Sequence, residues 1–373
     1  MSDAETSSDS ARTWDRYCDA IKLAGGQLLR AEAPKDALNQ AEGLRYLSRL
    51  VRLGLEMYVE SGDMQFPEFM TPSHETAKIG ADNPDNYYQV ARIDGRLEYR
   101  VSGTRGTVAF LNFSTKRGGY DSNGKLELSG FIDATMMAFE LDGRFELILS
   151  RERRPGNWLK LDADTSQLLV RQTFLDRGRE KLAQLKIDRI DQAAKPPPLD
   201  PVKLENNLMK AGGFVVGTAR LFANWAQSYL SHVNQLPPAD QAVCQQAGGD
   251  PNVFYYHSYW RLAPDEALVI EFPRVADCDY WNFQVDNHWM ESLDYRYFRI
   301  CINNHSARLD PDGRLTLIVS HTDPGHSNWL ETAGHEQGTM CFRWINSREQ
   351  IHPATRVVKA GDFVPKRQLG SAQ

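Results

Sequence analysis

The chain contains one short segment twice, as Asp142-Gly-Arg-Phe-Glu-Leu-Ile-Leu-Ser150 and as Asp312-Gly-Arg-Leu-Thr-Leu-Ile-Val-Ser320. An Asn-Trp-Leu triplet follows each copy, at residues 157–159 and again at 328–330. The offset between the copies is 170 residues for the segment and 171 for the triplet. This regular spacing predicts an internal duplication, in which Asp-Gly forms a turn between two strands of each copy.

A third landmark is an arginine in a strand-like run, Arg171 in the first copy and Arg343 in the second, at an offset of 172 residues. A weaker match relates Tyr88 to Tyr256. From about residue 84, apolar and polar residues alternate over short segments that Gly, Asn and Asp separate, which is typical of antiparallel strands. We therefore expect an α+β protein that is mainly β, with two related, jelly-roll-like β-sandwich units and with N-terminal and connecting helices.

Helical periodicity predicts the remaining elements. Apolar residues share one helical face on either side of Pro34, and they do so again from about 214 to 233. Asp36 can cap the second of these helices and Gly62 can end it. We predict four regions: an N-terminal helical region at 1–82, a first β-sandwich at 83–192, a proline-rich linker with connecting helices at 193–248, and a C-terminal jelly-roll-like domain at 249–373.

Composition excludes several classes of protein. The 373 residues carry a formal net charge of −6, so the chain lacks the basic surface that binding to nucleic acid requires. No apolar run is long enough to span a membrane, and the polar, acidic N-terminus does not resemble a signal peptide. We therefore expect a cytoplasmic protein without nucleic-acid or membrane partners. The five cysteines are scattered and contain no CxxC, which argues against a disulfide framework or a thiolate zinc site.

Several common catalytic motifs are absent from the sequence. The chain has no GxGxxG after a strand, no P-loop, no GxSxG and no HExxH, so dinucleotide, nucleotide, α/β-hydrolase and zincin chemistry have no support. We expect no cofactor and no metal site. A site built from His288, His321 or His335 with a carboxylate remains an open alternative, because neutral imidazoles are common metal ligands.

The C-terminal motifs resemble those of the uncharacterised family called domain of unknown function 1214. The resemblance is carried by the run from Trp289 to Arg296, by His321-Thr-Asp-Pro-Gly325 and by the triplet at 328–330, and it covers roughly residues 250 to 350. It implies a jelly-roll-like sandwich for the C-terminal domain and a related sandwich before it. It implies no particular chemistry.

The duplication also suggests where chemistry could occur. Residues present in both copies are expected to serve the fold, whereas polar residues present in only one copy are candidates for function. Eight of the nine histidines follow residue 230. Alternation in the strand that ends at Ser320 places His321 on its apolar side, at the mouth of the second sandwich, where the only large cavity is expected. The predicted acid–base residues are His321, Asp323 as its orienting group, Glu291 and Asp294.

Substrate contacts are expected from aromatic and ionisable residues of the same half. Arg343 is a candidate anion anchor, although both it and Arg171 could instead form structural ion pairs. The polar side chains of Gln284, Asp286 and His288 share one strand face, which is either solvated or lines a pocket. The predicted substrate-binding residues are Arg343, Trp289, Trp329, Tyr295, His335 and His288.

Two functions are compatible with these residues. The first is a small-molecule enzyme, a hydrolase or lyase, that uses general acid–base chemistry on a bulky hydrophobic or cyclic substrate. The alternative is a non-catalytic β-sandwich module that binds a carbohydrate or a lipid-like ligand, since tryptophan and tyrosine rings serve either purpose.

Overall fold

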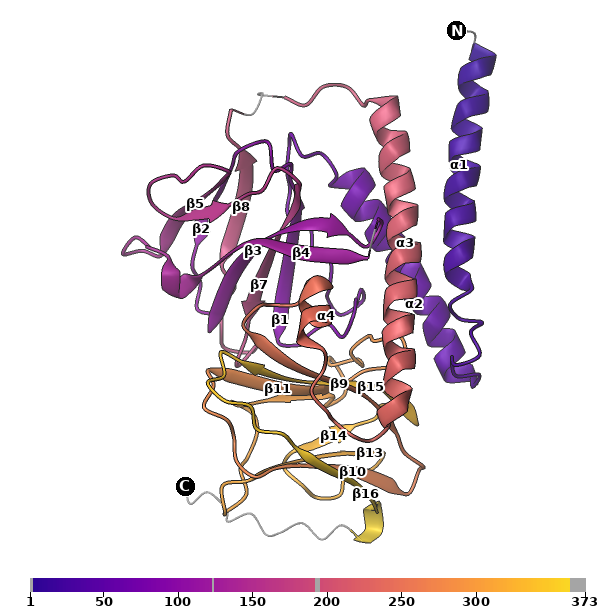
Figure 1. Ribbon diagram of the computed structural model, residues 1–373, viewed down its shortest axis with the longest axis vertical. Coiled ribbons are helices and arrows are strands. Elements are labelled where there is room, and N and C mark those ends of the chain that lie inside the picture. The colour runs from indigo at the N-terminus through magenta and orange to yellow at the C-terminus, as the bar shows by residue number, and fades with distance from the viewer. Residues whose placement is uncertain (1–2, 123, 192–194, 363–373) are drawn as a thin grey trace.

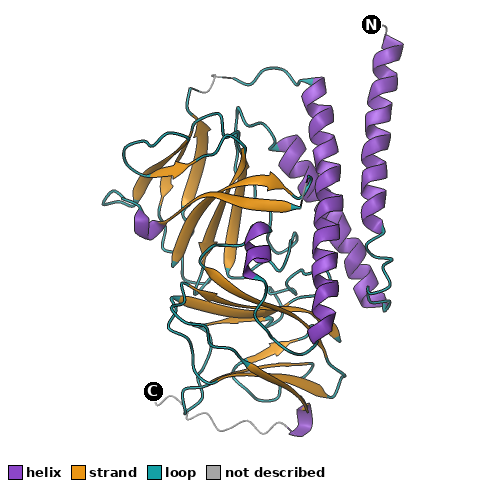
Figure 2. Ribbon diagram, in the orientation of Figure 1, coloured by secondary structure: helices purple, strands orange, loops and turns teal. Residues whose placement is uncertain are grey.

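Two β-sandwich units form most of the molecule, and helices cover one side of them (Figures 1 and 2). The structure is a computed structural model that describes residues 3–122, 124–191 and 195–362. Residues 193–194 of the predicted proline-rich linker and residue 192 of the predicted first sandwich lie outside the described residues, as does the C-terminal end of the predicted last domain. The architecture is mainly β, with four sheets in two similar units, as the sequence predicts.

The first unit consists of two four-stranded sheets. Its strands are β1 (Asn86–Arg92), β2 (Tyr99–Thr104), β3 (Phe110–Gly119), β4 (Lys125–Asp133), β5 (Arg144–Ser150), β6 (Trp158–Lys160), β7 (Thr165–Thr173) and β8 (Gln184–Arg189). One sheet has the order β1-β7-β3-β4 and the other has the order β6-β5-β2-β8. The inner faces of the two sheets enclose a core of apolar side chains that includes Phe113, Leu147 and Val170.

The second unit repeats this topology strand for strand. Its strands are β9 (Val253–Arg261), β10 (Glu266–Phe272), β11 (Tyr280–Val285), β12 (Cys301–Asn303), β13 (Leu315–Ser320), β14 (Trp329–Glu331), β15 (Gln337–Ile345) and β16 (Ala354–Lys359). The sheet orders are β12-β11-β15-β9 and β14-β13-β10-β16. Its core contains Trp281, Phe342 and Trp344. The duplication predicted from the sequence is therefore present in the fold.

Repeated residues make the same contacts in both units. Asn157 accepts a hydrogen bond from the amide of Ala138 at 2.8 Å and donates to two carbonyls, and Asn328 does the same with Arg308 and Thr316. The Asp-Gly turns place Gly143 and Gly313 at φ of 83° and 82°, a conformation that glycine adopts without strain.

Helices connect the two units and brace them. They are α1 (Asp3–Gly25), α2 (Ala37–Leu55), α3 (Pro201–Tyr229) and α4 (Gln241–Gln246), with a π-helical turn at Glu56–Glu60 and 3-10 turns at Ala134–Met136, Leu230–His232 and Ala360–Asp362. Asp36 caps α2, as predicted, by accepting a hydrogen bond from the amide of Asn39. The long helix α3 runs past both units, with α1 packed beside it (Figure 1).

Alternation along the strands decides which side chains face the space between the units. Along β7, Leu168 and Val170 point into the first core, so Leu169 and Arg171 point out of it. Along β15, Phe342 and Trp344 point into the second core, so Arg343 points out. The equivalent sheets of the two units therefore present their outer faces to the same space. Gly217 brings α3 close to this space, because a Cβ there would lie 1.7 Å from the carbonyl oxygen of Tyr120.

Candidate functional site

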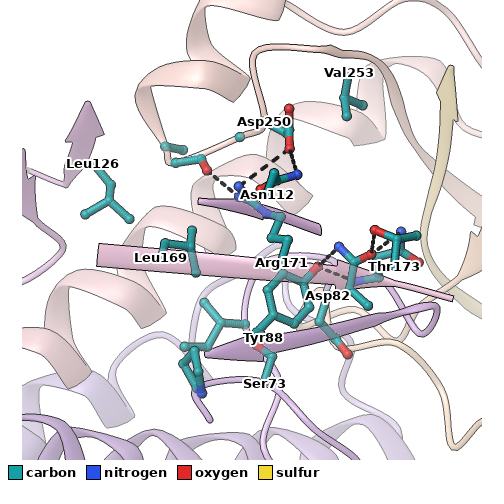
Figure 3. A pocket seen from close by; sticks show the side chains of 18 of the residues that line it. Ser73, Asp82, Tyr88, Asn112, Leu126, Leu169, Arg171, Thr173, Asp250 and Val253 are labelled. Carbon is teal, nitrogen blue, oxygen red and sulfur yellow. Dashed lines mark hydrogen bonds and ion pairs between the residues drawn. The ribbon is translucent and has the colours of Figure 1, made fainter. Parts of the chain in front are cut away.

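A cavity of about 510 Å³ lies between the two sandwiches (Figure 3). Its walls come from outward-facing residues of both units, from α3 and from the segment that joins α4 to β9. The residues of the wall include Tyr88, Asn112, Tyr120, Arg171, Phe214, Phe222, Trp225, Tyr255, His257 and Arg343. The expectation that the large cavity opens at the strand end near His321 is wrong, because the cavity forms where two copies meet rather than at the mouth of one.

The first unit contributes a row of three polar residues on neighbouring strands. Arg171 pairs with Tyr88 of β1 on one side and with Asn112 of β3 on the other. The guanidinium lies over the Tyr88 ring at 6.0 Å from the ring centre. All three side chains line the cavity, and Arg171 extends from its strand toward Asp250 (Figure 3).

The second unit carries the same row. Arg343 of β15 pairs with Tyr255 of β9 and with Asn282 of β11. The strand register thus makes Tyr255, and not Tyr256, the counterpart of Tyr88, so the weaker sequence match was out of step by one residue. A one-residue slip reverses the face of a strand, and Tyr256 indeed lies in the core of the second sandwich.

The two arginines differ in how completely they are hydrogen-bonded. Nη1 of Arg343 donates to Oε1 of Gln284 at 2.6 Å, and Nη2 donates to the carbonyl of Ala81 at 2.5 Å. Nη2 of Arg171 donates to the carbonyl of Gly248 at 2.7 Å, but its buried Nη1 has no hydrogen-bond partner. The carboxylate of Asp250 lies 3.9 Å from this Nη1, which is too far for a hydrogen bond.

The segment from Ala247 to Asp250 fastens the second unit to the first. Its carbonyl and carboxylate oxygens accept hydrogen bonds from Tyr120, Arg171, Lys116 and Asn112. Nδ2 of Asn112 donates to Asp250 at 2.9 Å, whereas its Oδ1 is buried and has no partner. Burial and the nearby charge of Arg171 lower the pKa of Lys116 to about 7. Four buried polar atoms of described residues that line the cavity have no hydrogen-bond partner, namely Nη1 of Arg105, Oδ1 of Asn112, Nη1 of Arg171 and Nδ1 of His257.

His257 contributes a neutral imidazole to the wall. Burial and the charge of Arg343 lower the pKa of His257 to about 3. Its Nε2 lies 3.8 Å from Sγ of Cys341, and its Nδ1 is buried without a hydrogen-bond partner. Burial raises the pKa of Cys341 to about 12, so the pair is a thiol and a neutral ring and not a thiolate–imidazolium pair.

The four predicted acid–base residues do not line this cavity. His321 contacts the carbonyl of Leu262 and the hydroxyl of Thr332, whereas Asp323 accepts from the amide of Gly325. Glu291 is buried and forms an ion pair with Arg49 of α2 at 2.6 Å. Asp294 pairs with Arg296 near the surface, and this pairing lowers its pKa to about 2. The structure therefore does not bring them together as one acid–base group.

Among the predicted substrate-binding residues, Arg343 lines the cavity. His335 instead contacts Glu42 of α2 at 2.8 Å, and His288 contacts the hydroxyl of Tyr259 at 2.9 Å. Nε1 of Trp289 donates to the carbonyl of Asn39, and Nε1 of Trp329 donates to that of Ser320. The ring of Tyr295 lies under Nζ of Lys78, 4.8 Å from its centre.

Several predicted residues nevertheless meet at the contact with α2. Nδ2 of Asn287 donates to both Glu42 and Glu291, and Glu42 in turn contacts His335. The polar face formed by Gln284, Asp286 and His288 is buried rather than solvated, and it does not line the cavity. Gln284 donates to the carbonyl of Asp82 and to Asp286, whose pKa burial raises to about 7.

Sequence reasoning missed most of the cavity wall. The repeated arginines could be recognised in the sequence, but the equivalence of their strand neighbours Asn112 and Tyr255 could not, because the offset between equivalent residues changes from 167 to 172 along the duplication.

In the described ranges no group of three or more His, Cys, Asp or Glu side chains could hold a metal ion. No helix of the described chain is long and apolar enough to cross a membrane.

Comparisons with known proteins identify a family and solved structures that this chain resembles. The family described as "Protein of unknown function (DUF1214)" matches residues 261–349. A solved structure of an uncharacterised protein from Burkholderia cenocepacia is 58% identical, covers 95% of this chain and 98% of its own, and superposes with a TM-score of 0.94. A protein from Vibrio parahaemolyticus is 12% identical over 91% of this chain and 100% of its own, with a TM-score of 0.48. No curated protein matches. The chain belongs to the same family as the Burkholderia cenocepacia protein, and its residues 261–349 match the DUF1214 family.

Proposed function

We propose that the protein binds a small amphipathic molecule in the cavity between its two sandwiches, with an oxygen-bearing head group on Arg171. The observation that carries the proposal is Nη1 of this arginine, which lines a cavity of about 510 Å³, has no hydrogen-bond partner and lies 3.9 Å from the carboxylate of Asp250. A buried guanidinium nitrogen without an acceptor costs free energy, which a ligand oxygen would recover. Ligand pockets of 300–1,000 Å³ with few polar groups are typical of small-molecule sites.

The distribution of polar groups favours an amphipathic ligand over a carbohydrate. The unpaired polar atoms of Arg171 and Asn112 lie together at one part of the wall. Apolar side chains, among them Leu126, Leu169 and Phe222, form much of the remainder. A sugar would need hydrogen-bonding groups around its whole ring, whereas a carboxylate with an apolar body needs them only at its head.

Acid–base catalysis by a hydrolase or lyase is the weaker candidate. Such a reaction needs its proton-transfer groups within hydrogen-bond reach of the substrate. His321, Glu291 and Asp294 have partners elsewhere, so they would not reach a molecule held by Arg171.

Calorimetric titration with two carboxylates of similar size, 2-naphthoate and decanoate, tests the proposal. We expect at least one of them to bind with one molecule per chain. Arg171→Met should weaken that binding about tenfold or more, because a hydrogen bond to a charged group contributes about 1.5–3 kcal/mol. Arg154→Met, which removes an exposed arginine paired with Glu98, should leave the affinity unchanged. The proposal would be overturned if neither acid bound to the unmodified protein.

A further inference from the structure

Six rings form a continuous aromatic wall along one side of the cavity. Tyr120 contacts Phe222 edge-on at 5.7 Å between ring centres, and Phe222 contacts Trp225 edge-on at 5.6 Å. The chain of contacts continues from Trp225 to His257 at 5.8 Å and from His257 to Tyr255 at 5.7 Å, with Phe214 beside Tyr120 at 6.5 Å. All six side chains line the cavity, and they come from α3, from β9 and from the turn that follows β3.

His257 and Tyr255 of this wall make further contacts with residues outside the wall, so the wall is rigid. The ring of Tyr229 stacks on His257 with an interplanar angle of 1°, and Tyr255 stacks on it with an angle of 11°. The hydroxyl of Tyr255 accepts a hydrogen bond from the amide of Asp250. Such preformed aromatic surfaces favour planar ligands, because flat rings gain contact area and offset or edge-on stacking without ordering flexible chains.

His257 places one further polar atom in this wall. Its side chain is 5% exposed, and Nδ1 has no hydrogen-bond partner. Nε2 is directed to Sγ of Cys341, so Nδ1 is the ring atom left for another molecule. Tyr255 stacks on the imidazole, and Tyr255, His257 and Arg171 all line the same cavity. One small molecule can therefore contact both groups.

We infer that the ligand is an aromatic acid, whose carboxylate binds Arg171, whose ring lies against the aromatic wall and whose ring hydroxyl is recognised by Nδ1 of His257. This inference rests on the proposed function and narrows its ligand class. The same wall makes a flexible alkyl chain a poorer fit, because ordering its rotatable bonds costs free energy that a fused ring does not lose.

Titration of the unmodified protein with matched acids separates this inference from the proposed function. We expect 2-naphthoate to bind at least tenfold more tightly than decanoate, and 6-hydroxy-2-naphthoate to bind more tightly still. Equal affinities for 2-naphthoate and decanoate would overturn the aromatic assignment and leave the proposed function standing. Failure of all three acids to bind would overturn both.

Two variants test the individual contacts. Trp225→Leu should weaken 2-naphthoate at least fivefold more than it weakens decanoate, and Trp14→Leu, at a largely exposed tryptophan, should alter neither. His257→Phe keeps a ring in the wall and should abolish the advantage of the hydroxylated acid while 2-naphthoate still binds. His305→Phe, at an exposed histidine, is its control. Circular dichroism establishes that each variant is folded. An unchanged preference for the hydroxylated acid in folded His257→Phe would overturn the role of His257.

Discussion

Arg171 and Arg343 occupy equivalent positions in the two sandwiches but have different tasks. Arg343 is 6% exposed, and both of its terminal nitrogens donate to protein oxygens. Arg171 has the same strand neighbours, Tyr and Asn, yet one of its nitrogens has no hydrogen-bond partner. In the second copy the arginine holds the carbonyl of Ala81, whereas in the first copy one nitrogen remains able to donate to another molecule. The two copies thus place an arginine at equivalent positions, but only the arginine of the second copy has both terminal nitrogens hydrogen-bonded within the protein.

The largest expected effect is the loss of stability when the structural arginine is removed. Arg343→Met leaves Gln284 and the carbonyl of Ala81 without their donor, and two lost hydrogen bonds to a charged group predict about 3 kcal/mol or more of destabilisation. Arg171→Met should cost about 1.5 kcal/mol, half as much, because one such bond is lost. Urea denaturation measures both values. Equal losses for the two variants would contradict the assignment of different tasks.

The turn asparagines provide a second, smaller contrast between the copies. Asn328 is fully buried, whereas its counterpart Asn157 is partly exposed, although each makes three equivalent hydrogen bonds. Asn328→Ala should destabilise the protein by about 2 kcal/mol more than Asn157→Ala, since water can replace the lost partners only at the exposed site. Thermal denaturation of the two variants measures the difference. A larger loss for Asn157→Ala would be the contrary result.

Among the described residues, two ion pairs connect the second copy to α2, Glu291 with Arg49 and His335 with Glu42, and the pair with the histidine should make stability depend on pH. Burial opposes the charged forms, but the contact between the two groups raises the pKa of His335 above 6.5 and lowers that of Glu42 below 4.5. The contribution of His335 is therefore present below pH 6.5 and is lost as the pH rises through its raised pKa. That of Glu42 is present above pH 4.5 and is lost on acidification.

Denaturation at pH 6 and pH 8 tests this linkage. The unmodified protein should lose more stability than Glu42→Gln over this interval, because only the unmodified protein loses the His335–Glu42 ion pair as His335 is deprotonated. His335→Gln should behave like Glu42→Gln. The same pH dependence in all three proteins would show that another group is responsible.

The smallest effect on stability and affinity is expected for His321, which the sequence predicts as an acid–base residue. His321 is replaced by Arg151 in the first copy, and its two hydrogen bonds are to Leu262 and Thr332 at the edge of the second sandwich. His321→Ala should change stability by about 1 kcal/mol or less and leave the affinity for 2-naphthoate unchanged. A tenfold loss of affinity measured by calorimetry would contradict this prediction and would indicate that the binding site lies near the 321–335 loop.

The sequence predicts the parts of the fold that depend on local pattern. Repetition of the segment at 142–150 reveals the duplication, alternation reveals the strands, and Asp36 marks the start of α2. These features are encoded within a few residues of one another. Local periodicity also separates the two faces of β7, which is why Leu168 and Val170 could be expected in a core.

Contacts between distant segments decide the rest, and periodicity carries no information about them. The polar face at Gln284 and Asp286 is buried because Asp82 and Asn83, about 200 residues away, cover it. Presence in both copies does not by itself separate scaffold residues from residues of the cavity wall, because Arg171 and Arg343 both line the cavity. The outer faces of the two copies meet and bring the repeated arginines to one cavity.

The cavity belongs to neither sandwich, since each supplies only one part of the wall. A ligand can therefore bind only when both units are folded and docked, and by mass action it would stabilise their association as well as each fold. Occupancy would act as a reversible cross-link between residues 86–189 and 253–359. Unfolding of the loaded protein should consequently be more cooperative than unfolding of the empty one, with the two sandwiches losing structure in a single transition.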